Sequence, residues 1–195
     1  MITDILLVLG AYLIGSISSA ILICRLLGLP DPRDGGSGNP GATNVLRLGG
    51  KKAAAATLAG DMLKGLIPVL IAKGLGADID IQASAAVAAF LGHLYPVFFG
   101  FKGGKGVATA LGVLLGIHWQ VGLLTIVTWL VIAKLFKISS LAALLAILVT
   151  PIYIWLLIPE PSLMIAMLFM GTLLFWRHRE NIRKIMDGTE GRIGR

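Results

Sequence analysis

The chain has 195 residues, of which 56% are hydrophobic and 14% are charged, and its formal net charge is +7. This composition, with a mean hydropathy of +0.88, excludes an ordinary water-soluble globular protein and indicates a membrane protein. Nearly the whole length divides into apolar runs of about 20 residues, the length that crosses a bilayer as a helix. A single polytopic membrane domain over residues 1–195 is therefore expected.

Taken in chain order, the apolar runs predict an all-α integral membrane bundle of about seven transmembrane helices. The expected spans are Ile5–Leu27, Ala53–Lys73, Ile79–Phe99, Val107–Ile117, Trp119–Phe136, Ser139–Ile158 and Leu163–Trp176. The fourth run is short. It either forms a hairpin with the fifth that turns at His118, or joins the fifth as one bent element, which would move the C-terminus to the other side.

The distribution of charge favours the seven-span arrangement. With seven spans, all but Lys64 and Lys73 of the 17 basic residues fall in segments on one side. The other side carries the acidic residues Asp4, Asp78, Asp80 and Glu160. The positive-inside rule then places the N-terminus outside and the C-terminus in the cytoplasm. Basic cytoplasmic loops facing anionic lipid explain the net charge, so no nucleic-acid partner is expected.

The first polar segment, DPRDGGSGNPGATNVLRLGGKK, follows the first span. Its Gly, Asn, Ser and Thr residues favour turns whose consecutive amides converge on an anion. Asn44 or Thr43 is expected to cap a short helix that directs Arg47 toward this anion. An ordinary flexible loop is the alternative. The candidate substrate-binding residues here are Gly38, Asn39, Gly41, Thr43 and Asn44.

The second polar segment, FGFKGGKG, follows the third span and does not have the Walker A spacing, which excludes nucleotide hydrolysis of that type. Its glycines let the backbone approach a ligand, its lysines add charge, and a helix that is expected to begin at Val107 adds the positive end of its dipole. A pair of lysines snorkelling at a span boundary is the alternative. The candidate substrate-binding residues are Lys102, Gly103, Gly104, Lys105 and Gly106.

The third polar segment, RHRENIRKIMDGTEGR, follows the last span. His178 and Asn181 are three residues apart, so on a continuing helix they would share a face and could address one ligand. An ordinary basic exit from the membrane is the alternative interpretation.

Three further polar residues lie within apolar runs. Asp61 and Lys64 are one helical turn apart and are expected to form a structural ion pair, because charges inside a membrane need a partner. His93, at the end of the third span, is expected either at the membrane interface or in contact with the ligand. Neither a metal nor a cofactor is expected, because the histidines are scattered and the sequence has no HExxH motif or cysteine pair.

The segments SGNPGATNVLRLGGKKAA, GHLYPVFFGFKGGKGVATALG and RHRENIRKIMDGTE resemble, in order and spacing, the three motifs of the bacterial acyl-phosphate-dependent glycerol-3-phosphate acyltransferases. With GDMLKG and the hydrophobic pattern between the motifs, the resemblance covers essentially the whole chain. It implies acyl transfer from acyl phosphate to the 1-hydroxyl of glycerol 3-phosphate in the lipid bilayer. The products would be lysophosphatidic acid and inorganic phosphate, in the first acylation of phospholipid biosynthesis.

The resemblance also implies the functional positions. These are Ser37 and Arg47, the glycines around Lys105 as the glycerol 3-phosphate site, and His178, Asn181 and Glu190. We expect Ser37, Arg47, His178 and Asn181 to be catalytic and Glu190, like Asp61 and Lys64, to be structural. The expected location is the bacterial plasma (inner) membrane, with the active site on the cytoplasmic face. The alternative function is a membrane transporter of phosphate or a phosphorylated metabolite.

The expected mechanism is direct attack of the glycerol hydroxyl on the acyl phosphate, supported by positioning and electrostatics. Either His178 or the departing phosphate would accept the proton. An acyl-Ser37 intermediate is a third possibility.

Overall fold

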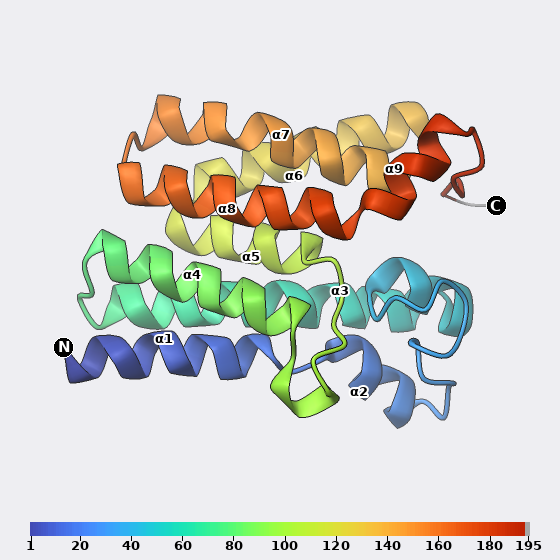
Figure 1. Ribbon diagram of the computed structural model, residues 1–195, viewed down its shortest axis with the longest axis horizontal. Helices are drawn as coiled ribbons and strands as arrows, with labels where there is room; N and C mark the ends of the chain where they lie inside the picture. Colours follow the sequence, from blue (N-terminus) through green and yellow to red (C-terminus); the bar gives the residue numbers. More distant parts are fainter. Residues whose placement is uncertain (194–195) are drawn as a thin grey trace. The chain divides into compact units, whose positions relative to one another are not determined.

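The computed structural model describes residues 1–193, and all regular secondary structure within them is helical (Figure 1). The helices are α1 (Ile2–Gly15), α2 (Ser19–Leu26), α3 (Ala42–Gly74), α4 (Ile79–Leu94), η1 (Val97–Phe99, a 3-10 helix), α5 (Val107–Ile117), α6 (Trp119–Phe136), α7 (Ser139–Leu157), α8 (Pro161–Arg177) and α9 (Arg179–Met186). The predicted all-α class is confirmed. With α4 and η1 taken together as the third expected span, the predicted bounds from there onward agree with the helices to within two residues.

Among the described residues, four helices are long and apolar enough to cross a membrane: α3, α4 extended by η1, α6 and α7. The pair α1 and α2, bent by 42° at the break between them, is a fifth candidate. Helices α5 and α8 are apolar but shorter. The protein is therefore a polytopic membrane protein, whereas a total of seven spans stays a prediction.

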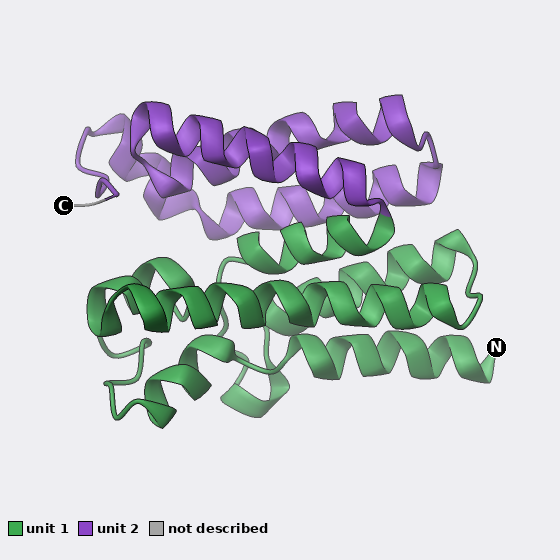
Figure 2. Cartoon of the chain, turned by 180° about the vertical axis from the view of Figure 1, so that it is seen from behind, with its two compact units in different colours: residues 1–117 green, residues 118–195 purple. Residues whose placement is uncertain are grey.

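The chain divides into two compact units, residues 1–117 and residues 118 onward, which Figure 2 shows in different colours. Helices α1 to α5 belong to unit 1, and α6 to α9 belong to unit 2.

The prediction of a continuous first span is wrong, because the helix is interrupted at residues 16–18. The Ser16 hydroxyl donates to the Tyr12 carbonyl at 2.8 Å, a local bond of the kind that bends helices, and Ser18 occupies the N-cap position of α2. Next to the break, Gly15 packs so closely on the backbone of Ala89 in α4 that a Cβ atom at residue 15 would overlap it. Small residues thus bring α1 and α4 together, as at many membrane helix contacts.

Helix α3 is longer than the predicted second span, because it begins at Ala42 and runs for 33 residues. Gly50 interrupts it with a non-helical backbone (φ 76°, ψ −172°), so the predicted short helix and the predicted span meet there. The left-handed φ explains why glycine occupies this position.

In unit 2, two pairs of hydroxyl groups join α6 to α7. Thr125 and Thr150 are 3.1 Å apart, and Thr128 lies 2.7 Å from the Tyr153 hydroxyl. Thr128 also donates to a carbonyl of its own helix; of Thr125 and Thr150, one donates to its own helix and the other to its partner. Such pairs satisfy polar groups between apolar helices.

Candidate active site

The buried side chain of Asn44, which is 1% exposed, organises the loop at residues 29–41 between α2 and α3. Its Oδ1 accepts a hydrogen bond from the Ser37 amide at 2.8 Å. Its Nδ2 donates to the carbonyls of Pro32 at 2.8 Å and Gly35 at 2.9 Å. One asparagine amide, which carries both donors and an acceptor, therefore fixes three backbone groups of the loop.

The prediction that Asn44 or Thr43 caps the helix is wrong. The N-cap position of α3 is Gly41, which is in an extended conformation and provides no side-chain cap. The Asn44 amide is engaged by the loop instead, and Thr43 is exposed in the first turn. Asn44 thus shapes the candidate anion site by folding the loop that leads to it.

Asn44→Ala is expected to lower the free energy of unfolding of unit 1 by about 2 to 4 kcal/mol, because three backbone groups lose a buried partner. Cys24, which is buried and is the only cysteine, provides the readout through its reaction with a thiol-reactive fluorophore during denaturation in detergent. The matched control is Thr43→Ala at an exposed position of the same turn, with an expected change within about 0.5 kcal/mol. Unfolding of Asn44→Ala under the same conditions as the parent would contradict the role of this side chain.

The two predicted catalytic residues of this segment lie on the same part of unit 1. Ser37 and Gly38 are exposed, and Gly38 has a left-handed backbone (φ 68°). Arg47 is also exposed and follows Asn44 by three residues, on the helix face that holds the Ser37 amide. Asn39 is half-buried, and its carbonyl accepts a hydrogen bond from the Gly41 amide at 2.9 Å. Ser37 and Arg47 are therefore both exposed and both linked to the start of α3, Ser37 through its backbone amide and Arg47 as a residue of the helix.

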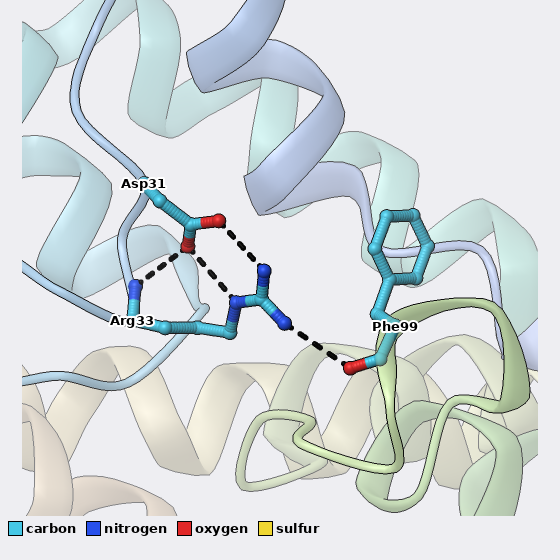
Figure 3. Close-up of polar contacts among 3 residues, drawn as sticks. All are labelled: Asp31, Arg33 and Phe99. Atoms are coloured by element: carbon cyan, nitrogen blue, oxygen red, sulfur yellow. Dashed lines mark hydrogen bonds and ion pairs between the residues drawn. The ribbon is translucent and has the colours of Figure 1, made fainter.

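Arg33 attaches this loop to the second polar segment, 66 residues further along the chain (Figure 3). Its guanidinium group contacts both carboxylate oxygens of Asp31, at 3.0 and 2.8 Å, and donates to the Phe99 carbonyl at 3.1 Å. The guanidinium of Arg25 in α2 lies 5.9 Å from the centroid of the Phe99 ring. Arg33 was not among the residues predicted for the site, and its only signal in the sequence is its two-residue spacing from Asp31.

The Arg33 guanidinium, by hydrogen-bonding to Asp31, lowers the pKa of that carboxyl below its usual value of 3.8. A carboxyl with a lowered pKa in the folded state contributes stability above its unfolded pKa, and this contribution disappears as the pH falls through the folded value.

Asp31→Asn is therefore expected to reduce stability at neutral pH by about 1 to 2 kcal/mol, the range of a charge-assisted hydrogen bond. The difference from the parent should shrink as the pH falls below about 4. Denaturant titrations followed by circular dichroism at several pH values measure it, with Asp34→Asn at a neighbouring exposed position as control. A difference that stays constant down to low pH would rule out the ionised pair as its source.

Residues 100–106, the glycine loop, form a tight turn that packs on the end of α4. Gly100 and Gly106 have left-handed backbones (φ 64° and 90°). Gly103 and Gly104 are buried, and a Cβ atom at Gly103 would overlap the carbonyls of His93 and Leu94. The glycine backbone therefore approaches α4 closely at Gly103, whereas its approach to a ligand stays a prediction.

The glycine loop also adjoins the loop at residues 29–41, because a Cβ atom at Gly104 would lie 3.0 Å from the Pro40 carbonyl oxygen. Lys102 is exposed and Lys105 is half-buried between Gly104 and Gly106. Helix α5 begins at Val107, as predicted. The first two polar segments thus contact each other, and the N-terminus of α5 follows directly on the glycine loop.

The predicted ion pair of Asp61 and Lys64 is present and buried, with 2.9 Å between the Lys64 Nζ and the Asp61 Oδ1. His93 is buried next to it, with its Nδ1 atom 3.6 Å from the same carboxylate oxygen. His93 therefore lies beneath the glycine loop, between the loop and the ion pair.

In unit 2, the third polar segment is folded differently from the prediction. The expected continuing helix is wrong: α8 ends at Arg177, and His178 (φ −98°, ψ 7°) forms the junction with α9. His178 is 3% exposed, and its Nδ1 lies 2.8 Å from the Leu174 carbonyl oxygen. A carbonyl only accepts hydrogen bonds, so Nδ1 carries the proton and the lone pair of the neutral ring is on Nε2.

Glu190 connects Asn181 to the start of α7. One carboxylate oxygen of Glu190 accepts hydrogen bonds from the Asn181 side-chain amide and from the Ser140 hydroxyl, each at 2.6 Å. Ser140 was not among the residues predicted for the site. The turn after α9 thus brings Glu190 back to orient the Asn181 amide. Within residues 1–193, no group of three or more His, Cys, Asp or Glu side chains is arranged to hold a metal ion.

The family model and the relatives that match this chain carry the same description. The family model described as glycerol-3-phosphate acyltransferase matches residues 5–188. The glycerol-3-phosphate acyltransferase of Methylococcus capsulatus is 58% identical over 189 residues, covering 97% of this chain and 96% of that protein. The one from Thioalkalivibrio sulfidiphilus is 60% identical over 188 residues, covering 96% and 93%.

Two crystal structures of PlsY (YgiH), an integral membrane glycerol 3-phosphate acyltransferase, are also similar. The glycerol 3-phosphate form has a TM-score of 0.94 and 42% identity, and the lysophosphatidic acid form has a TM-score of 0.90 and 41% identity. Both comparisons cover 98% of this chain and 96% of the other. With the family model matching nearly its whole length, the chain belongs to the glycerol-3-phosphate acyltransferase family.

Proposed function

We propose that this chain transfers an acyl group from acyl phosphate to the 1-hydroxyl of sn-glycerol 3-phosphate. The products are lysophosphatidic acid and inorganic phosphate, and the reaction is the first acylation of phospholipid biosynthesis. The observation that carries the proposal is the contact between the first two polar segments in unit 1, where Arg33 fastens the loop at residues 29–41 to the Phe99 carbonyl just before the glycine loop. Arg47 and Lys105 in these segments, together with the N-terminus of α5, suit phosphate groups, which both substrates contain.

The relatives support the acceptor and one product. PlsY has been crystallised in a glycerol 3-phosphate form and in a lysophosphatidic acid form. Acyl phosphate as donor comes from the resemblance of the three motifs, and its chemistry agrees with the site. An acyl phosphate is already activated, so its leaving phosphate needs positive charge more than a strong acid.

The proposed topology is that of seven spans, with the N-terminus outside and the active site on the cytoplasmic face of a bacterial inner membrane. The bent pair α1–α2 and the four long helices supply five candidate spans, and α5 and α8 are the apolar helices available for the other two. The distribution of basic residues supports the orientation. On this proposal the whole chain works as one acyltransferase domain.

In the proposed reaction, the 1-hydroxyl oxygen attacks the carbonyl carbon of the acyl phosphate. A carbon–oxygen bond forms to glycerol, the bond to the phosphate oxygen breaks, and inorganic phosphate leaves. Arg47 and Lys105 hold the phosphate groups, while Ser37, Asn39 and neighbouring amides complete their binding. The gain comes from positioning and from positive charge aimed at the charge that develops on the leaving group.

His178 and Asn181 are proposed to orient the hydroxyl or the leaving phosphate. The hydrogen bond to Leu174 leaves the lone pair of a neutral His178 on Nε2, and Glu190 fixes the Asn181 amide. The proton goes to His178 or to the departing phosphate, and His178→Gln distinguishes these routes. A loss of about 10²-fold or more with a changed pH profile assigns the proton to His178, and retained activity with the parent profile assigns it to phosphate.

The purified protein in detergent, given palmitoyl phosphate and glycerol 3-phosphate, tests the function directly. We expect lysophosphatidic acid and inorganic phosphate in equal amounts, with neither formed when glycerol 3-phosphate is omitted. Product from palmitoyl-CoA but not from palmitoyl phosphate would overturn the proposed donor. Phosphate uptake into proteoliposomes without any acylated product would instead support the transporter. The candidate residues argue against transport. They lie mostly in the polar segments at one proposed face, whereas a permeation path places polar partners along several spans.

A further inference from the structure

The break between α1 and α2 exposes a backbone carbonyl that a charged side chain satisfies. Ile17 lies in the break, and its carbonyl oxygen accepts a hydrogen bond from the Lys64 Nζ at 2.8 Å. Lys64 is 5% exposed. Inside a membrane protein an unpaired carbonyl is unfavourable, so the lysine compensates for the interrupted helix.

Asp61 connects Lys64 to His93. The Oδ1 atom of Asp61 is 2.9 Å from the Lys64 Nζ and 3.6 Å from the His93 Nδ1. All three side chains are buried, and they come from the middle of α3 and the end of α4. We call Asp61, Lys64 and His93 the buried cluster. Because it is enclosed, a change at one member is transmitted to the others instead of being absorbed by solvent.

His93 connects the buried cluster to the glycine loop. Its carbonyl oxygen accepts a hydrogen bond from the Gly104 amide at 3.2 Å. A Cβ atom on Gly104 would lie 2.9 Å from the Cε1 atom of the His93 ring, so the loop backbone rests on this side chain. Gly103 packs equally closely on the carbonyls of His93 and Leu94. The position of the His93 ring therefore sets the position of the backbone next to Lys105.

We propose that Asp61, Lys64 and His93 are positioning residues for the acyl transfer, because they fix the glycine loop from below through the contact between His93 and Gly104. This inference rests on the proposed function. It gives the intramembrane charges a purpose beyond stability, and it places His93 behind the phosphate-binding backbone, acting through the loop.

The kinetic test compares His93→Leu, which removes both ring nitrogens, with His93→Asn, which keeps a side-chain amide that can reach Asp61. Because the loop holds a phosphate in the ground state and the transition state alike, its displacement should raise KM more than it lowers kcat. For His93→Leu we expect the KM for glycerol 3-phosphate to rise at least tenfold while kcat stays within threefold. His93→Asn should recover most of the affinity.

The matched control is Val69→Ala, which removes a fully buried side chain of α3 outside the buried cluster. It should destabilise the protein without changing the KM for glycerol 3-phosphate. An unchanged KM in His93→Leu despite lowered stability would show that the buried cluster is only structural. An equal rise in KM in Val69→Ala would likewise overturn the proposal, because the effect would then follow stability.

Hydrogen–deuterium exchange of the peptide that contains residues 100–106 provides a readout that does not depend on activity. We expect exchange in this peptide to be at least tenfold faster in His93→Leu than in the parent and close to the parent rate in Val69→Ala. A raised KM with unchanged exchange would mean that His93 contacts the substrate directly, which overturns a positioning role. Faster exchange in His93→Leu, with no acyl transfer by the parent, would refute the proposed function while leaving the support of the loop intact.

Discussion

Lys64→Met is expected to lower the free energy of unfolding by about 3 to 5 kcal/mol, because removing one partner leaves a buried charge unpaired. Asp61 is 3% exposed and would keep only the His93 ring, 3.6 Å away. The Ile17 carbonyl would lose its lysine donor as well. The reaction of Cys24 with a thiol reagent in a denaturant series measures the change near the helix break.

The matched control for this prediction is Lys73→Met, an exposed lysine in the last turn of the same helix, with an expected change below about 1 kcal/mol. The double variant with Lys64→Met and Asp61→Asn should recover part of the lost stability, because no unpaired charge remains. If Lys64→Met unfolded within 1 kcal/mol of the parent, the buried ion pair would not support the fold.

Lys105→Ala is expected to lower kcat/KM by about 10² to 10³, the loss typical of removing one donor that stabilises developing charge. Lys105 is half-buried between two buried glycines, where a charge acts on a phosphate with less solvent screening than at the surface. Initial rates of phosphate release at varied concentrations of both substrates give the value.

Lys102→Ala is the control for Lys105→Ala, because it removes the same charge from an exposed position of the same loop. We expect it to change kcat/KM by less than about tenfold, since exposed charges are screened. Equal losses in the two variants would point to overall charge, and an active Lys105→Ala would remove this lysine from the site.

The apolar spans could be predicted because a hydrophobic run of about 20 residues has the length and composition of a helix that crosses a bilayer. The break in the first span was missed because Ser16 and Ser18 interrupt the apolar run only briefly, and each could equally point into a helix interface. The prediction of a continuing helix at His178 failed for a related reason, because the residues around His178 have ordinary helix propensity and do not signal a break. The hydrogen bond between Asn181 and Glu190 could not be predicted either, because it depends on a turn that brings together residues nine positions apart.

Within the site, sequence spacing predicted the contacts between residues that are close together in the chain. Asp61 and Lys64 pair at one helical turn, as their spacing indicated. Asn44 has the residue type of a cap, but its partners lie 7 to 12 residues upstream, so a capping rule assigned its amide wrongly. The bond from Arg33 to Phe99 joins segments 66 residues apart, a pairing that no pattern in either segment encodes.

In the proposed topology, the three polar segments lie at one face of the membrane. Single cysteines at the exposed positions Asp34, Lys102 and Lys184 test it, with Glu160→Cys as the marker for the opposite face. Cys24 is buried and should give little background. With a membrane-impermeant thiol reagent, we expect labelling at Asp34, Lys102 and Lys184 only after cells are permeabilised, and at Glu160 in intact cells. Labelling of Lys102→Cys in intact cells, while the other two stay protected, would contradict a shared face for the three segments.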